Sequence, residues 1–196
     1  MGEKAATKKW FSTGNILNAL FFAALIAVLF IPAAKSLLIR GLMGVGLFQP
    51  QTEQTASPLP AMDVTFRDSD GKTISLSSLK GKVVFINIWA TWCPPCLAEL
   101  PSINSLHKKL SNNPNIVFLI VDADNQLNKS VPFIKKHDYN LPVFETVTDI
   151  PSAMLGGSIP TTVVINKQGF IVFKHEGVAD YSGDEFTGYL QKLAGE

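Results

Sequence analysis

The sequence has few of the residues that metal-binding and nucleic-acid-binding proteins require. It has two cysteines and three histidines, and His107, His137 and His175 are scattered without the spacing of a metal site. A structural zinc site needs about four ligands, and the cysteines supply only two of them. The formal net charge is +1, which gives no electrostatic support for binding nucleic acid. We therefore expect no nucleic-acid partner, no metal and no cofactor.

Charge is also missing from one long segment, because no charged residue occurs between Trp10 and Ala34. A helix needs about 20 apolar residues to cross a hydrocarbon core roughly 30 Å thick, so we predict a transmembrane anchor over residues 15–34. A buried core helix would show polar residues along one face. Here Asn18 is the only clearly polar side chain after Ile16. A cleaved signal peptide is the alternative, but its apolar stretch is shorter, at about 7–15 residues.

Basic residues flank the predicted anchor unevenly. Three precede it and two follow it: Lys4, Lys8 and Lys9 before, Lys35 and Arg40 after. Because the more basic flank tends to stay in the cytoplasm, we expect residues 1–14 to be cytoplasmic and the rest of the chain to lie outside.

The segment after the anchor, residues 35–60, divides into two parts. Ser36 to Phe48 is apolar, contains Arg40 and is too short to span a membrane. It either lies along the membrane surface, with Arg40 reaching the headgroups, or continues the anchor helix past Pro32. The second part, residues 49–60, is polar and contains prolines, which is typical of a linker.

The remaining residues, 61–196, alternate between strand and helix patterns. We expect strands near 64–66, 72–74, 82–89, 115–121, 161–165 and 170–173, and helices near 96–110, 131–137 and 184–193. The continuous apolar run at 82–89 fits a strand buried on both faces. This alternation predicts an α/β domain whose central sheet is flanked by helices. A hairpin signal at residues 166–169 makes the expected sheet mixed rather than purely parallel.

Both cysteines lie in Trp92-Cys93-Pro94-Pro95-Cys96, after a predicted strand and at the start of a predicted helix. This context is typical of a thioredoxin-like redox pair. The free N–H groups and partial positive charge of a helix N-terminus stabilise a thiolate. Two intervening residues place the sulfurs one turn apart, close enough to bond. Cys93 would attack a substrate disulfide, and Cys96 would then release the reduced substrate.

Other interpretations of the pair are weaker. Covalent haem attachment needs a histidine after the second cysteine, where this chain has Leu97. A purely structural disulfide would stabilise little, because so short a loop restrains the unfolded chain weakly. Pro94 and Pro95 lack N–H donors for a Cys93 thiolate, which favours a reductant over a strong oxidant. An oxidase or isomerase with the same cysteines, and a redox-inert binding module, remain open.

Four further residues belong to the predicted surround of the cysteines. Glu99 shares a helix face with Cys96, where it either exchanges a proton with that thiol or is a solvated first-turn acid. Ile159-Pro160 precedes a predicted strand, and a cis proline there would bring backbone next to the reactive site. Trp92 is expected at the core or the rim of the site.

These residues carry a family resemblance. Residues 87–101, Asn-Ile-Trp-Ala-Thr-Trp-Cys-Pro-Pro-Cys-Leu-Ala-Glu-Leu-Pro, resemble the TlpA/ResA-like family of thioredoxin-fold thiol:disulfide oxidoreductases. Residues 159–166, Ile-Pro-Thr-Thr-Val-Val-Ile-Asn, are similar to the cis-proline segment of that family. The resemblance covers about residues 61–195.

The resemblance implies roles for four residues. Cys93 would be the nucleophile, Cys96 the resolving thiol and Glu99 the active-site glutamate. Pro160 would be cis and pack against the cysteines. Asn87 departs from the buried aspartate of thioredoxin itself, which leaves proton transfer to Glu99 or to water.

The resemblance also implies a location and partners. A single-pass protein of the bacterial inner membrane, with its catalytic domain on the periplasmic side, would receive electrons from a membrane thiol donor. It would reduce disulfides of exported proteins, including apocytochromes c awaiting haem. Peroxiredoxins share the fold but carry proline and threonine or serine where this chain has Ile86 and Ala90, so we expect no peroxidase.

Overall fold

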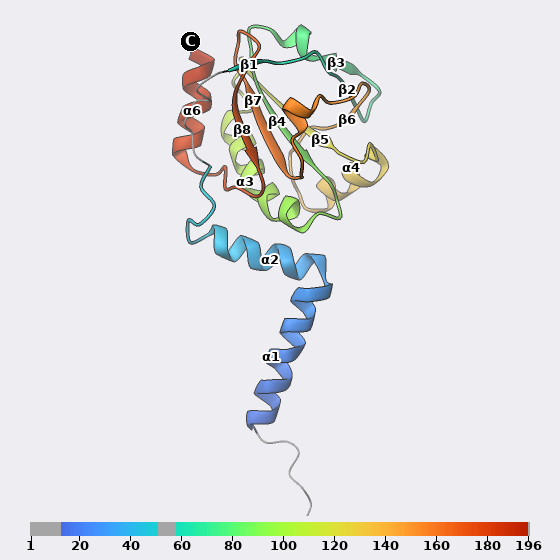
Figure 1. Cartoon of the computed structure of the whole chain (residues 1–196), viewed down its shortest axis with the longest axis vertical. Helices are drawn as coiled ribbons and strands as arrows, with labels where there is room; N and C mark the ends of the chain where they lie inside the picture. The colour runs from blue at the N-terminus through green and yellow to red at the C-terminus, as the bar shows by residue number, and fades with distance from the viewer. Residues whose placement is uncertain (1–12, 51–57, 196) are drawn as a thin grey trace, which may run out of the picture.

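The computed structural model describes residues 13–50 and 58–195. The expected cytoplasmic segment 1–14 therefore lies almost wholly outside the described residues, as does most of the expected linker. The first helix, α1 (Thr13–Phe30), is long and apolar enough to cross a membrane, with a mean hydropathy of 2.0. None of its residues is buried, and Figure 1 shows it extending away from the rest of the molecule.

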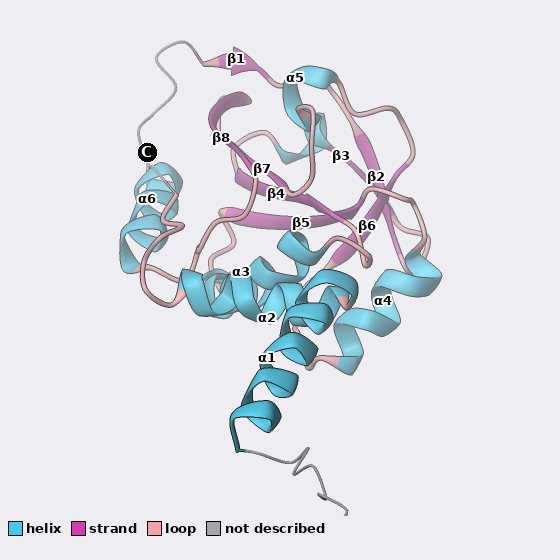
Figure 2. Cartoon of the chain, turned by 60° about the horizontal axis from the view of Figure 1, so that its bottom comes forward, coloured by secondary structure: helices cyan, strands magenta, loops and turns pink. Residues whose placement is uncertain are grey.

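The second helix, α2 (Pro32–Met43), begins after a break in which Ile31 has extended backbone. Pro32 suits the first helical position because its missing N–H would have no helical partner there. The helix changes direction from α1 and lies beside α3 (Pro94–Leu110), as Figures 1 and 2 both show. Arg40 donates from Nη2 to the Leu97 carbonyl at 2.7 Å, so it is turned towards the domain and not towards headgroups.

The domain is built on one mixed sheet of eight strands in the order β1-β8-β7-β4-β5-β6-β2-β3. The strands are β1 (Leu59–Pro60), β2 (Thr65–Asp68), β3 (Thr73–Ser75), β4 (Val83–Trp89), β5 (Ile116–Asp122), β6 (Val143–Thr146), β7 (Thr161–Ile165) and β8 (Phe170–Glu176). The neighbours β4, β5 and β6 are parallel, and the other pairs are antiparallel. The predicted mixed α/β sheet is therefore confirmed.

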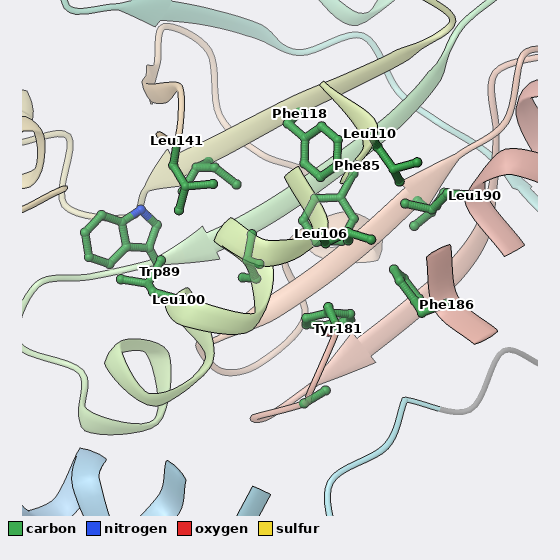
Figure 3. Close-up of a cluster of buried hydrophobic side chains, with 14 of the residues drawn as sticks. Phe85, Trp89, Leu100, Leu106, Leu110, Phe118, Leu141, Tyr181, Phe186 and Leu190 are labelled. Atoms are coloured by element: carbon green, nitrogen blue, oxygen red, sulfur yellow. The ribbon is translucent and has the colours of Figure 1, made fainter. Parts of the chain in front are cut away.

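Helices cover the two faces of this sheet unequally. On one face, α3, α4 (Leu127–Lys136) and α6 (Asp184–Gly195) pack over a large apolar cluster. Figure 3 shows its centre, where Phe85 of β4 meets Leu106 of α3 and Phe186 of α6. A 3₁₀ helix at residues 76–79 and the short α5 (Ser152–Leu155) cover the second face. Every residue of β4 is buried, as expected for a strand with packing on both sides.

Four elements have no counterpart among the expected ones. They are strands β1 and β6, helix α5 and the 3₁₀ helix at residues 76–79, each only two to four residues long and too short to show a period. Strand β1 pairs with β8 through Leu59 and Ile171, within the segment expected to be a linker. Helix α4 also begins at Leu127, ahead of the expected residue 131.

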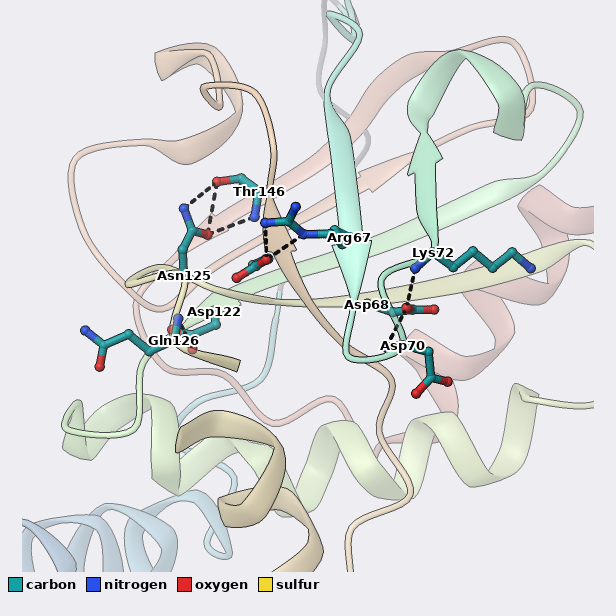
Figure 4. A network of polar contacts seen from close by, with 9 residues as sticks. Arg67, Asp68, Asp70, Lys72, Asp122, Asn125, Gln126 and Thr146 are labelled. Atoms are coloured by element: carbon teal, nitrogen blue, oxygen red, sulfur yellow. Dashed lines mark hydrogen bonds and ion pairs between the residues drawn. The ribbon is translucent and has the colours of Figure 1, made fainter. Parts of the chain in front are cut away.

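Polar contacts hold the loop that follows β5 (Figure 4). The carboxylate of Asp122 accepts hydrogen bonds from the amides of Asp124 at 3.0 Å and Gln126 at 3.1 Å. The side chain of Asn125 accepts from the backbone amide of Thr146 in β6 at 2.8 Å and donates from Nδ2 to Thr146 Oγ1 at 3.0 Å. These bonds fix Asp124 beside the carboxyl end of the central strands.

Candidate active site

The two cysteines lie where β4 gives way to α3. Strand β4 ends at Trp89, and Cys93 is the residue that caps the N-terminus of α3. Cys93 and Cys96 form a disulfide with an S–S distance of 2.13 Å and a Cα–Cα distance of 5.3 Å. In this disulfide form both are nearly covered, with exposures of 3% for Cys93 and 0% for Cys96.

The helix N-terminus is aimed at the sulfur of Cys93. The amide of Cys96 donates to Cys93 Sγ at 3.3 Å. Pro94 and Pro95 occupy the intervening positions and have no N–H to donate. The next amide, that of Leu97, bonds to the Cys93 carbonyl oxygen at 3.0 Å. One backbone donor therefore reaches the sulfur from the helix.

The segment before β7 lies against the same sulfur. The Ile159–Pro160 peptide bond is cis, and Pro160 is buried. The carbonyl oxygen of Ile159 is 3.9 Å from Cys93 Sγ. Two segments far apart in the sequence, residues 92–96 and 159–160, are thus brought together as the sequence analysis expected.

The rim of the site is partly apolar and open to solvent. Trp92 is 60% exposed, and its indole N–H donates to Asp124 Oδ2 at 2.6 Å. Pro94 and Pro95 are half-buried beside it. Asp124 was not expected to matter from the sequence, because nothing in a polar loop distinguishes it before the fold places it next to Trp92.

Glu99, on α3 three residues after Cys96, is fully buried, which excludes the alternative of a solvated first-turn acid. Its carboxylate accepts two hydrogen bonds. Asn87 of β4 donates from Nδ2 to Oε1 at 2.7 Å, and the amide of Ala179 donates to Oε2 at 3.2 Å. Asn87 also donates to Thr162 Oγ1 at 3.0 Å, which ties the acid to β7.

Burial determines the protonation of this carboxyl group. Loss of solvent raises the pKa of Glu99 to about 8, even though the hydrogen bonds from Asn87 and Ala179 favour the charged form. Burial and the nearby Glu99 charge also raise the pKa of Tyr181. A carboxyl group that titrates near neutral pH can both accept and supply a proton. The sequence signal for this arrangement was Asn87, a polar residue within an otherwise apolar strand.

No metal centre accompanies these residues. Among residues 13–50 and 58–195, no group of three or more histidine, cysteine or acidic side chains is placed to hold a metal ion. His107 has a lowered pKa because it is half-buried, and its ring packs on Phe118 at 5.0 Å between centroids.

The fold and the bridged cysteines define a thioredoxin-fold protein with a Cys-Xaa-Xaa-Cys pair at the start of a helix. The Redoxin family description matches residues 54–193. The chain belongs to this family.

Known relatives show which kind of thioredoxin-fold protein the chain resembles. The chain is 34% identical over 163 residues to the thiol-disulfide oxidoreductase ResA of Bacillus cereus, covering 80% of this chain and 91% of that protein. It is 31% identical over 166 residues to ResA of Bacillus thuringiensis, with the same two coverages.

A solved structure agrees with these relatives. The thiol:disulfide interchange protein of Chlorobium tepidum matches with a TM-score of 0.59 and 27% identity, covering 71% of this chain and 99% of that one. The resemblance to TlpA/ResA-like proteins is therefore confirmed, and the chain is a thiol:disulfide oxidoreductase.

Proposed function

We propose that the enzyme is anchored in the bacterial inner membrane and reduces disulfides of exported proteins through Cys93 and Cys96. The observation that carries this proposal is the disulfide at the N-terminus of α3, with the Cys96 amide directed at Cys93 Sγ. A disulfide in this position can accept two electrons from a donor dithiol and later give them to a substrate.

The reaction starts from the reduced pair. The Cys93 thiolate attacks one sulfur of the substrate disulfide, forming a mixed disulfide and releasing the other substrate sulfur as a thiolate. The Cys96 thiolate then attacks Cys93 Sγ, which forms the protein disulfide and releases the second substrate thiolate. Two electrons pass to the substrate. A membrane protein with a dithiol returns the pair to its reduced form.

Glu99 supplies proton transfer in the second step. Cys96 has no exposure to solvent, so its thiol needs a buried group to take its proton. A carboxyl group with a pKa of about 8 is suited to this role near neutral pH. Asn87 and Ala179 hold the carboxylate in place, and we propose them as positioning residues.

The direction towards reduction rests on the donors that reach Cys93. Strong oxidants of this class have a much-stabilised reduced thiolate. Here Pro94 and Pro95 leave the Cys96 amide as the backbone donor from the helix. A less stabilised thiolate gives up its electrons more readily, which favours a reductase.

The location rests on α1. Its length, its hydropathy and its lack of buried residues support the expected anchor at residues 15–34. The basic residues before it support a cytoplasmic segment 1–14 and an extracytoplasmic domain from residue 61, joined through residues 35–60.

Reduction potential is the first test. We expect a value near that of thioredoxin, about −270 mV, when the full chain in detergent is equilibrated with dithiothreitol buffers and its thiols are trapped. A potential near −120 mV would instead assign the chain to the strong oxidants.

A trapping experiment tests the residue roles. The Cys96→Ser variant should accumulate a mixed disulfide through Cys93 with an oxidised apocytochrome c peptide, because no thiol remains to resolve it. The matched Cys93→Ser variant should trap none, since Cys96 is covered. If the Cys93→Ser variant traps the peptide equally well, the assigned order of attack is wrong.

A further inference from the structure

Helix α2 has two unlike faces, and only one of them is covered. The covered face contains Ser36 and Met43, which are buried, and Arg40, which bonds to Leu97 of α3. These residues are spaced by four and three positions, so they form one stripe along the helix. The stripe carries Ser36 and Arg40, two of the three polar side chains of the helix, and packs on the enzyme domain.

The opposite face is apolar and open. Leu37, Leu38 and Leu42 are 69%, 51% and 41% exposed. Val45 and Leu47, directly after the helix, are likewise exposed. In a soluble protein a helix presents the reverse arrangement, with its apolar stripe inward and its polar face to water.

The position of α2 next to α1 in the chain indicates what covers this apolar face. Only Ile31 separates α2 from α1, which is mostly apolar and has no buried residue. The exposed apolar surface therefore continues from the membrane helix onto α2, whereas the enzyme domain has few large exposed apolar side chains. Lys35 is exposed near the start of α2, where a long basic side chain can reach lipid headgroups.

We infer that α2 lies in the outer interface of the bilayer, with Leu37, Leu38 and Leu42 in lipid and the opposite stripe holding the enzyme domain. This inference rests on the proposed membrane anchor and specifies how the domain is held. Amphipathic helices of this kind bury their apolar face about 5–10 Å into the headgroup region.

Contacts of α2 and of the segment after it fix the orientation of the domain relative to this helix. The Arg40–Leu97 bond joins α2 to the first turns of α3, which Cys93 caps. A second bond, from the Asp180 amide to the Phe48 carbonyl at 2.7 Å, joins the segment after α2 to the loop before α6. Packed helices lie about 8–10 Å apart, so the cysteines sit about one helix layer above the lipid. Substrates with disulfides close to the membrane surface fit this placement.

Fluorescent labelling of the full chain in lipid nanodiscs tests the inference. In a Cys93→Ala/Cys96→Ala background, single cysteines at Leu17, Leu38 and Lys72 carry an environment-sensitive dye. The dye at position 17 reports whether α1 lies in the bilayer, and the dye at Lys72, an exposed residue beside β3, is the control. We expect the Leu38 dye to be blue-shifted and quenched most by nitroxide lipids labelled near the headgroup, and the Lys72 dye to remain in water.

The alternative outcomes are distinct. A Leu17 dye in lipid with a Leu38 dye in water would overturn the inference and leave the anchor standing. A dye at position 17 that stays in water would overturn both the inference and the proposed membrane anchor. A blue-shifted Leu38 dye that no nitroxide lipid quenches would show that a second copy of the chain or another protein covers α2, and would overturn lipid as the occupant.

A second variant keeps both native cysteines. Leu38→Glu/Leu42→Glu changes only exposed side chains, so the fold and the reduction of a soluble peptide disulfide should be unchanged. Reduction of the same peptide tethered to a lipid headgroup should fall severalfold, because the domain is no longer held at the surface. Equal rates for the variant and the parent chain on the tethered peptide would contradict the inference.

Discussion

Helices α1 and α3 have nearly the same length, 18 and 17 residues, but opposite relations between composition and burial. Apolar α1 buries none of its residues. Helix α3 buries polar side chains, among them Glu99, Ser102 and Asn104. Burial in this chain therefore follows the position of a helix relative to the sheet and not its mean hydropathy.

The buried polar residues of α3 all have partners. Ser102 Oγ donates to the Glu99 carbonyl at 2.7 Å and accepts from the Tyr181 amide at 3.2 Å. Asn104 Oδ1 accepts from the Asn140 amide at 2.9 Å. Such bonds offset the cost of removing polar groups from water. Helix α1 has the opposite need, because its exposed apolar side chains are favourable only in an apolar surrounding.

Leucine-to-alanine substitutions in the two helices should differ most in their effect on stability. Leu106→Ala removes a fully buried side chain of α3 and should lower the free energy of unfolding by about 2–5 kcal/mol. Leu20→Ala, at a 64% exposed position of α1, should change it by less than about 0.5 kcal/mol. Urea unfolding of the full chain in detergent measures both. Equal losses would mean that α1 packs against the domain.

A charged side chain in α1 tests whether this helix lies in a membrane. Leu20→Arg should weaken membrane insertion by about 3 kcal/mol, because an arginine near the bilayer centre is costly. The fraction of the chain that resists alkaline extraction from membranes should fall accordingly. Leu59→Arg, at an exposed leucine of the domain, is the matched control and should leave that fraction unchanged. A Leu20→Arg chain that stays fully in the membrane fraction would contradict the anchor.

The buried carboxyl group of α3 makes stability depend on pH. Because the pKa of Glu99 is about 8 when folded and 4.5 in its ordinary state, the unfolded chain loses this proton at a lower pH than the folded chain does. Unfolding thus becomes easier as pH rises from about 4.5 to 8. The expected slope is about 1.4 kcal/mol per pH unit from this one group.

Glu99→Gln isolates this effect. The other ionisable side chains are present in both the variant and the parent chain, so the change with pH in the difference between their unfolding free energies reports Glu99. The variant should become more stable relative to the parent chain as the pH of the oxidised full chain is raised from 5 to 7.5. A difference that is constant with pH would show that Glu99 is ionised throughout and could not exchange protons near neutrality.

The same contrast explains how far sequence reasoning could reach. The strand at 83–89, the helix after the cysteines and the terminal hairpin follow from strong local patterns, and the structure has all of them. The cysteine pair was recognisable because both residues lie within five positions at a strand-to-helix junction. These features depend on neighbours in the chain, which a sequence displays directly.

Features that depend on tertiary contact were not visible. The sequence left Glu99 undecided between a group that exchanges a proton with Cys96 and a solvated first-turn acid, because only the packing of α3 on β4 and on Ala179 removes its water. One of the two alternatives left open for residues 36–48 placed Arg40 at the lipid headgroups, since a cation in an apolar stretch has no better local partner. Its actual partner, the Leu97 carbonyl, is distant in the chain and is available only once α2 lies on α3.

Removal of the Arg40 guanidinium tests this contact between α2 and α3, and its effect on stability should be small. Arg40→Met keeps the apolar stem but removes the guanidinium, so the domain should lose about 1 kcal/mol of stability at most, since the side chain is half-exposed. Hydrogen exchange of the α2 amides is the more sensitive readout, and it should quicken while exchange in β4 is unchanged. Arg40→Lys is the control, because it keeps the charge but not the planar fork of donors. If Arg40→Met leaves α2 exchange unchanged, apolar packing around Met43 suffices to hold the two helices together.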